Sequence, residues 1–423
     1  MVIPREDLIQ SCISIYVFLF IFTMFNREFV PFGIDLRYIM LLVAMILMFY
    51  FTIMHYKKFY QMLKNRQWMT IKENTINYLS ETKYLPLLLG LFYVGMFIST
   101  LMWLGNGLSL NTGDFKSSII LNSMNLISII VFLAFKNKIK VKNVIISIVV
   151  AQLVLFISML LIWKGFHLTE IMGGDYSGLY SGPENHNFLG HEFRLAGYAQ
   201  DPNYTSFFMV ISGLTVLTFV KNKIIKYGVL GTSLFGFLLS ASRTVTLGVI
   251  SGIFFVLLWN ILKKKYPKLV NLYIIICISI FSVIPYVMIK LSHIIAIKTN
   301  LVSMSNRFIM WENAAMLFEK SPIIGNGLTS FRSFYEMNGG WYVQSHSTIF
   351  QLMSEQGVLG LILFVLIFIF LMREEGNYKQ YLCFVFLVFS LTSELVYLSI
   401  FPFVVCLLPI INSKCINVQE KKI

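Results

Sequence analysis

Long apolar runs, separated by short polar connectors, dominate this chain of 423 residues. A helix that crosses a bilayer needs about 20 mainly apolar residues, and twelve runs approach or exceed this length. They cover residues 8–25, 36–54, 84–104, 118–135, 143–163, 203–220, 227–241, 244–261, 269–289, 347–372, 380–393 and 395–411. The pattern predicts an all-α fold, a single polytopic membrane domain over residues 1–423 with about twelve transmembrane helices.

Composition excludes a water-soluble globule, because 57% of the residues are apolar and only 13% are charged, against roughly 25% charged residues in soluble domains. The five cysteines lie in apolar runs or near the C-terminus without CxxC spacing, so neither a disulfide framework nor a zinc site is expected. Residues 1–7 precede an apolar run with no small-residue cleavage site behind it. We therefore expect a retained first helix rather than a signal peptide.

The distribution of positive charge predicts the orientation. Twelve spans place both termini on one side, and 23 of the 34 Lys and Arg residues fall on that side, in seven short segments. The positive-inside rule assigns this side to the cytoplasm. The net charge of +14 is thus a signal of membrane topology. Because the lysines form no single stripe, no nucleic-acid partner is expected.

The orientation can be tested by cysteine labelling in intact protoplasts. Cysteines introduced near Gly182 and Gly339 should react with an impermeant thiol reagent, whereas one at Lys264 should not. Labelling of Lys264→Cys from outside would overturn the orientation, and with it the assignment of the active face.

Two long extracytoplasmic loops are predicted, 164–202 and 290–345, the second containing an interfacial helix. The apolar stretch 227–262 is too long for one helix and carries lysines at both ends. It is best interpreted as a hairpin whose tip, 240–243, places Arg243 at the outer rim of the bilayer. The same reasoning makes 380–411 a hairpin with Glu394 at its outer tip.

Arginine and lysine separate by side. Six of the nine arginines are expected outside, against five of the 25 lysines. Guanidinium groups bind phosphate and carboxylate bidentately, so this bias suits an anionic ligand at the outer face. The alternative is that these arginines snorkel to lipid headgroups. The six are Arg27, Arg37, Arg194, Arg243, Arg307 and Arg332.

Several site types are missing from the sequence. It contains no GxxxxGK[ST] loop, which excludes an ATP-driven pump within the chain, and no DxD pair to hold a metal-bound nucleotide sugar. Glu355 and Glu394 are the carboxylates near apolar spans, so a coupled transporter is disfavoured. The His and Glu residues of 184–192 match no metal-site spacing, so no metal is expected. Two classes of protein remain: a transferase that uses a lipid-linked donor, and a lipid flippase.

Four segments then carry a resemblance. They are RLAGYAQDPNYTS (194–206), SASRT (240–244), NRFIMWENAAMLFEKSPIIGNGLTSF (306–331) and QSHSTIFQLMSEQGVLG (344–360). In order and in type they resemble the bacterial O-antigen ligase and polymerase superfamily, which includes the Wzy-type polysaccharide polymerases. The motifs of that family are R-x-x-G with (D/N)PN, SR, an arginine with tryptophan followed by P-x-x-G-x-G, and a downstream H-(S/N).

The resemblance implies a GT-C-like glycosyltransferase that moves a glycan from an undecaprenyl-pyrophosphate carrier to an acceptor hydroxyl outside the membrane. It implies no cofactor, neither a nucleotide sugar nor an obligatory metal. The partners are the lipid-linked oligosaccharide donor and acceptor and the membrane lipid. A chain-length regulator and a flippase are candidate partner proteins.

The resemblance also implies residue roles. Arg243, Arg307 and Arg194 correspond to the family arginines that hold the pyrophosphate, and His346 to the base. Ser347 follows this histidine where many relatives have Asn. Arg332 has no clear counterpart and, with Trp311 and Glu336, is a further candidate for substrate binding.

Local sequence gives these positions a physical role. Ser305 is a suitable N-cap for an amphipathic helix over 306–320, ended by Pro322 and Gly325. This would place Arg307 in the first turn, where the helix dipole favours anions, with Trp311 one turn further on the same face. Phe308, Ile309, Leu317 and Phe318 would form a surface suited to the membrane interface. Asp201 and Pro202 are typical of a helix start, and a purely capping role for this motif stays open.

His346 is the predicted general base, with Glu336 and Glu355 as rivals. Glu336 is expected in a loop rich in Gly and Asn, without a fixed position. Glu355 lies nine residues further along the predicted helix, about 13 Å deeper by helix rise. A capping or substrate-binding role for His346 is the alternative.

The predicted function is polymerisation of lipid-linked repeat units into a capsular or O-antigen-type surface polysaccharide. The alternatives are a ligase or oligosaccharyltransferase that moves finished glycan to another acceptor, and a lipid-linked oligosaccharide flippase. The excess of lysine over arginine, 25 to 9, suits an AT-rich genome. Many such bacteria make capsules and lack lipid A, which favours the polymerase.

Overall fold

The computed structural model divides the chain into two compact units. Unit 1 comprises Met1–His55, Ile127–Ile250 and Pro402–Ile423, and unit 2 comprises Tyr56–Leu126 and Ser251–Phe401. The residues that the structure describes are 5–24, 36–64, 85–105, 112–166, 179–181, 193–199, 201–277, 280, 287, 302–340, 343–373, 376–395 and 397–411.

Unit 1 is built mainly from helices. Its elements are α1 (Arg5–Thr23), α6 (Val141–Trp163), α8 (Pro202–Phe219), α9 (Lys223–Ser240) and the π-helix η4 (Phe403–Leu407), with the start of α2 (Leu36–Lys64), the end of α5 (Thr112–Ala134) and the start of α10 (Arg243–Lys265). The strands β1 (Leu179–Ser181) and β2 (Phe193–Leu195) pair antiparallel, with Tyr180 opposite Arg194. The short 3-10 helix η2 (Gly197–Ala199) follows them.

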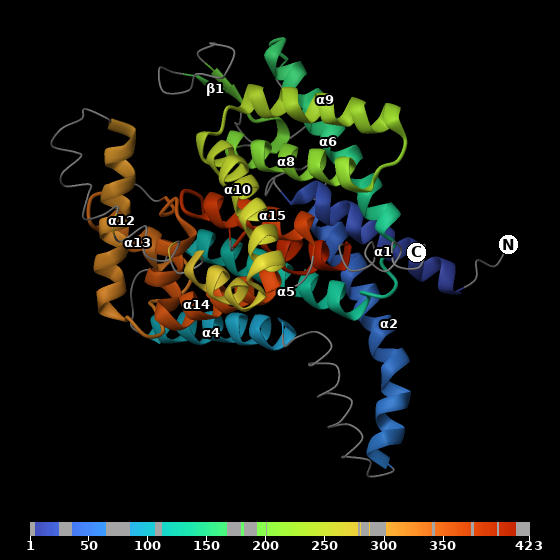
Figure 1. Ribbon diagram of the computed structural model, residues 1–423. Helices are drawn as coiled ribbons and strands as arrows, with labels where there is room; N and C mark the ends of the chain where they lie inside the picture. Colours follow the sequence, from blue (N-terminus) through green and yellow to red (C-terminus); the bar gives the residue numbers. More distant parts are fainter. Residues whose placement is uncertain are drawn as a thin grey trace. The chain divides into compact units, whose positions relative to one another are not determined.

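Helix α6 is the centre of unit 1. Val144, Ile148, Ala151 and Leu155 recur at the helical period and are fully buried, because α1, α8, α9 and η2 pack around this helix. Helices α8 and α9 lie side by side along their length (Figure 1). This packing fixes the end of α9, from which the turn into α10 starts.

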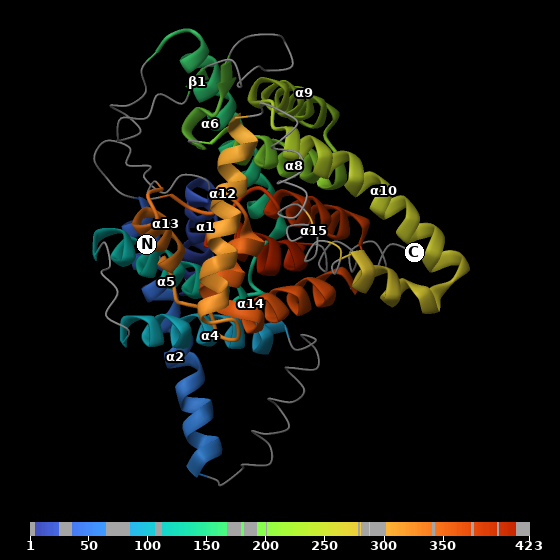
Figure 2. The same ribbon diagram turned by 90° about the vertical axis from the view of Figure 1, so that its left-hand side faces the viewer.

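Unit 2 is organised around one long helix, α14 (Thr348–Arg373). Four other helices pack against it (Figure 2): α4 (Leu85–Gly105), α12 (Val302–Lys320), α13 (Ser330–Met337) and α15 (Asn377–Ser390). The short η3 (Pro267–Leu269) also belongs to this unit, and α16 (Ile400–Pro402) lies at its boundary.

A break inside α14 receives the segment that follows α12. Gly357 has non-helical backbone angles, φ 66° and ψ −165°, which free carbonyl and amide groups. Val358 N donates to Pro322 O at 2.8 Å, and Gly327 N donates to Glu355 O at 2.9 Å. The P-x-x-G-x-G sequence is therefore a docking segment that fills the break in α14.

Glycine is required at this junction. A Cβ on Gly325 would lie 2.3 Å from Gln356 N, and one on Gly357 would lie 2.4 Å from Ile323 O, and both residues have positive φ. Because backbone atoms cannot yield, Gly325→Ala and Gly357→Ala should each reduce the free energy of unfolding by at least about 2 kcal/mol. Thermal unfolding in detergent measures this.

Gly95→Ala is the matched control, since nothing lies within 4 Å of the place that a Cβ would take there, and its helix α4 would gain from alanine. An unchanged transition temperature for both junction variants would contradict the docking account.

The described residues contain six helices long and apolar enough to cross a membrane, within α1, α2, α4, α6, α10 and α14. Shorter apolar helices cover Ser118–Ala134, Pro267–Cys277 and Ile400–Ile411. An all-α membrane protein fits these findings, with β1 and β2 as a small addition. The count of twelve spans stays a prediction, and much of the expected span 269–289 lies outside the described residues.

The two expected loops contain more regular structure than predicted. Residues 164–202 contribute β1, β2 and η2, and residues 290–345 contribute α12 and α13. Regular helix is interrupted between α15 and α16, as the second predicted hairpin requires, but Glu394 in this interval is buried, at 3% exposure. Helix α15 ends at Ser390 and regular helix resumes only at Ile400.

Candidate functional site

The turn between α9 and α10 confirms the predicted break at 240–243. Helix α9 ends at Ser240, Ala241 takes a left-handed conformation with φ 48°, and α10 begins at Arg243. Ser242 caps α10, because its Oγ accepts from Val245 N at 3.3 Å. Arg243 is exposed in the first turn. An exposed guanidinium beside a helix N-terminus is suited to an anionic ligand.

Arg194 holds this turn together. Its Nε donates to Ser240 O at 2.8 Å, and its Nη2 donates to Asn203 Oδ1 at 3.0 Å. Ser242 Oγ donates to the same Asn203 oxygen at 2.8 Å. The structure therefore brings Arg194 to the Arg243 turn, but engages its guanidinium with the protein, at the C-terminal end of α9. Asn203 of the DPN sequence joins the two motifs.

The glycine of R-x-x-G has a packing role. Gly197 has φ +57°, and a Cβ there would lie 2.6 Å from Ser158 Oγ on α6. The next residue, Tyr198, donates from its amide to Ser158 Oγ at 3.0 Å and from its hydroxyl to Ala151 O at 3.2 Å. Burial raises the pKa of the Tyr198 hydroxyl well above its usual range, so it remains a donor.

The predicted start of α8 is confirmed. Asp201 is the N-cap, with Oδ1 accepting from Asn203 N at 2.6 Å, and Pro202 is the first helical residue. Together with the Arg194 contacts, this cap fixes the approach of the chain to the Arg243 turn.

The predicted start of α12 is wrong. The helix begins at Val302, so Ser305 lies within it and Arg307 is its sixth residue, beyond the first turn. Serine and asparagine recur through 300–306, and each is an equally good cap by sequence, so the pattern did not single out one start. Of these two arginines, Arg243 therefore lies at a helix N-terminus and Arg307 does not. The predicted helix end at Lys320 is confirmed.

Trp311 contributes to the site through its contacts with protein. It is 3% exposed and packs in a cluster with Phe308, Leu317 and Phe350, stacking on Phe350 at 5.3 Å. Its Nε1 donates to Ser345 O at 2.9 Å. Trp311 thus fixes the residue before His346, and its own side chain is almost entirely buried.

The apolar surface of α12 is divided between protein and the exterior. Phe308 and Leu317 face the buried cluster, whereas Ile309 is 48% exposed and Met316 is 51% exposed. Only these exposed side chains are available to contact a membrane surface. Arg307, one turn before Trp311, is half-buried.

His346 is exposed on a fixed turn at the start of α14. Its backbone has φ 50°, while the flanking Ser345 and Ser347 are fully buried. Thr348 N donates to Ser393 O at 3.1 Å, and Leu395 N donates to Thr348 Oγ1 at 2.9 Å. These contacts hold a conformation that costs a non-glycine residue about 1–3 kcal/mol, so His346 is held where its ring faces outward.

The remaining candidates lie on α13 and α14. Arg332 is half-buried and interacts electrostatically with Glu355. Glu336 lies in the last turn of α13 and is exposed, so its predicted place in a loop is wrong. Phe331 and Tyr335, four residues apart, pack this short helix against the core, whereas the glycines that suggested a loop follow it. Glu355 has no exposed surface.

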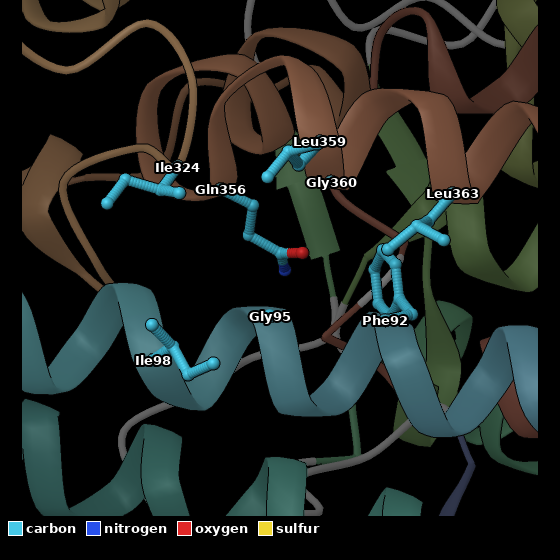
Figure 3. A pocket seen from close by; sticks show the side chains of 8 residues that line it. All are labelled: Phe92, Gly95, Ile98, Ile324, Gln356, Leu359, Gly360 and Leu363. Atoms are coloured by element: carbon cyan, nitrogen blue, oxygen red, sulfur yellow. The ribbon is translucent and has the colours of Figure 1, made fainter.

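A cavity of about 90 Å³ lies between α4 and α14. Figure 3 shows the Gln356 side chain directed from α14 toward Gly95 of α4. The other lining residues are apolar, among them Phe92, Ile98 and Leu359. None of the predicted site residues lines this cavity.

The candidate residues fall into two groups. Arg194 and Arg243 lie in unit 1, and Arg307, Trp311, Arg332, Glu336 and His346 lie in unit 2. Among the described residues, no group of three or more His, Cys, Asp or Glu side chains is placed to hold a metal ion.

Comparison with known proteins identifies the domain that carries most of these residues. Residues 228–365 match the family model described as Wzy_C, O-antigen ligase. Members of this family are glycosyl-transferring enzymes that act on lipid-linked oligosaccharides in the membrane. No curated protein and no solved structure matches the chain. Residues 228–365, about a third of the chain, are thus similar to the O-antigen ligase family, which supports the resemblance to the O-antigen ligase and polymerase superfamily.

Proposed function

We propose that this protein polymerises undecaprenyl-pyrophosphate-linked repeat units into a surface polysaccharide at the outer face of a bacterial plasma membrane, with both termini in the cytoplasm. The observation that carries the proposal is Arg243, exposed at the Ser242-capped N-terminus of α10 within the matched domain. A pyrophosphate needs planar, bidentate donors and a positive local field, and this position offers both.

The proposed reaction is a substitution at the anomeric carbon of the donor. The acceptor sugar hydroxyl forms the new glycosidic bond, the bond from the anomeric carbon to the pyrophosphate oxygen breaks, and undecaprenyl pyrophosphate leaves. His346 takes the hydroxyl proton. Its exposed position and the fixed backbone around it support this role, because a base must be held within reach of the proton that it accepts.

The arginines have different roles in substrate binding. Arg243 binds the leaving pyrophosphate, and Arg307 and Arg332, which are half-buried, supply further positive charge to the lipid-linked substrates. Arg194 acts by holding the Arg243 turn. Since fixed cations and a helix N-terminus can stabilise the leaving-group charge, we expect membranes to retain transfer activity in the presence of a metal chelator.

The rival function is ligation of finished glycan to another acceptor, which the similarity of residues 228–365 to O-antigen ligases favours. The same residues would serve both functions, because only the acceptor differs. A flippase is the third possibility, and chain-length regulators and flippases are candidate partners of a polymerase.

Deletion of the gene separates these functions by the lipid-linked species that accumulates. The polymerase predicts single repeat units on the outer face. Full-length carrier-bound chains would instead indicate a ligase, and single repeats trapped on the inner face would indicate a flippase.

A further inference from the structure

A chain of buried polar contacts leads from His346 into the core of unit 2. Ser345, the residue before His346, donates from its amide to Gln351 Oε1 at 3.2 Å. Gln351 Nε2 in turn donates to Glu355 Oε1. Gln351 is 2% exposed and Glu355 has no exposed surface. The backbone that carries His346 is therefore linked to a buried carboxylate through one amide side chain.

The orientation of the Gln351 amide follows from its two neighbours. The Ser345 amide is a donor only, so the Gln351 atom that faces it must be the oxygen. The amide nitrogen then faces Glu355, which must present an acceptor oxygen to it. A carboxylate meets this requirement, whereas an apolar side chain would leave the Gln351 nitrogen buried without a partner.

Glu355 is itself held firmly. Its carbonyl oxygen accepts from Ser99 Oγ at 2.6 Å and from Gly327 N at 2.9 Å, which are the contacts that dock the glycine-rich segment at the break in α14. The Tyr397 hydroxyl and the Thr329 amide approach its carboxyl group, and Arg332 and Glu394 interact with it electrostatically.

Both peptide groups of Ser345 are thus fixed by buried side chains. Trp311 Nε1 holds the carbonyl oxygen and Gln351 holds the amide. The left-handed φ of 50° at His346 would otherwise relax, because it is unfavourable for a residue with a Cβ.

We propose that Glu355 is a positioning residue, which orients the Gln351 amide and through it holds the Ser345–His346 turn. It does not contact substrate, because it is fully buried. The inference rests on the proposed function only in taking His346 as the general base. The turn and its hydrogen bonds do not depend on that role.

An exchange of the two side chains tests the proposal. In Gln351→Glu alone, two acidic side chains face each other in the core, and the amide donor that joined positions 351 and 355 is lost. In the double variant Gln351→Glu, Glu355→Gln, the carboxylate again accepts from Ser345 N, and the side-chain amide introduced at position 355 donates to it. The exchange therefore restores both hydrogen bonds: the bond from Ser345 N keeps its direction, and the bond between positions 351 and 355 is reversed. Glu355→Leu removes the acceptor altogether.

Two readouts are needed, hydrogen exchange of the peptide that spans residues 343–350 and glycosyl transfer in membranes. Gln351→Glu and Glu355→Leu should speed exchange of this peptide roughly 10- to 100-fold and lower transfer by about 100-fold, the order expected when a base is displaced. The double variant should recover both. Glu319→Gln, exposed on α12, is the control and should change neither.

The outcomes separate this inference from the proposed function. If the double variant exchanges as fast as Gln351→Glu, Glu355 does not orient Gln351 and the inference is wrong. If exchange follows the predicted order but transfer stays at the wild-type level throughout, the turn is held as inferred and the assignment of His346 as the base fails instead.

Discussion

Replacement of Arg243 by alanine should abolish polymer while the protein level stays normal. The side chain is exposed in the first turn of α10, so its removal leaves the cap and the turn intact but takes away the guanidinium. Loss of one preorganised charge that stabilises a leaving group typically costs about 10²- to 10³-fold in rate. Transfer from lipid-linked donor in isolated membranes measures this loss.

The lysine variant distinguishes geometry from charge. Arg243→Lys keeps the charge but offers no planar pair of donors, so it should restore little activity. Arg307→Ala and Arg307→Lys should behave in the same way if Arg307 also contacts the pyrophosphate. Arg373→Ala, at an exposed position at the end of α14, is the matched control. Near-normal polymer from both lysine variants would show that these sites supply charge alone.

Replacement of His346 should leave donor binding intact but remove most of the transfer. A positioned base contributes about 10²- to 10⁴-fold to such a step, so His346→Ala should lose activity in this range. His346→Gln keeps a hydrogen-bonding side chain that cannot take the proton, and should be equally inactive. Binding of a lipid-linked donor and its turnover are measured separately.

The pH dependence gives a second test of the same role. Only the neutral imidazole accepts a proton, so wild-type activity should fall as the pH is lowered through the titration of His346. Full turnover by His346→Gln would reduce the residue to a positioning role. If His346 is the base, Glu336→Gln should change activity little, because Glu336, at the end of α13, is then not needed to accept the proton.

The sequence predicted those elements that depend on local pattern. The break at 240–243 follows from the length of the apolar run and the lysines at its ends, and the cap at Asp201 follows from residue type. Both are found in the structure. The start of α12 was predicted one turn late, because several residues before it are equally good caps.

The contacts between distant segments could not be predicted in this way. No periodicity indicates that Trp311 donates to Ser345 O, that Arg194 clamps the end of α9, or that Gly327 docks on Glu355. Such contacts depend on how helices pack after they form. From the sequence, Glu355 was considered as a rival base far from His346. Only the buried hydrogen bonds through Gln351 show that it is linked to the His346 turn.

Reconstitution of the purified protein tests the central claim most directly. Vesicles that contain the protein and undecaprenyl-pyrophosphate-linked repeat units, with no other protein and no nucleotide sugar, should yield a ladder of polymers with release of undecaprenyl pyrophosphate. The Arg243→Ala and His346→Gln variants should yield none. Two results would contradict the polymerase account. In one, the wild-type protein leaves the single repeat units unchanged but transfers preformed polymer to a separate acceptor. In the other, it moves the lipid-linked repeat units across the bilayer without joining them.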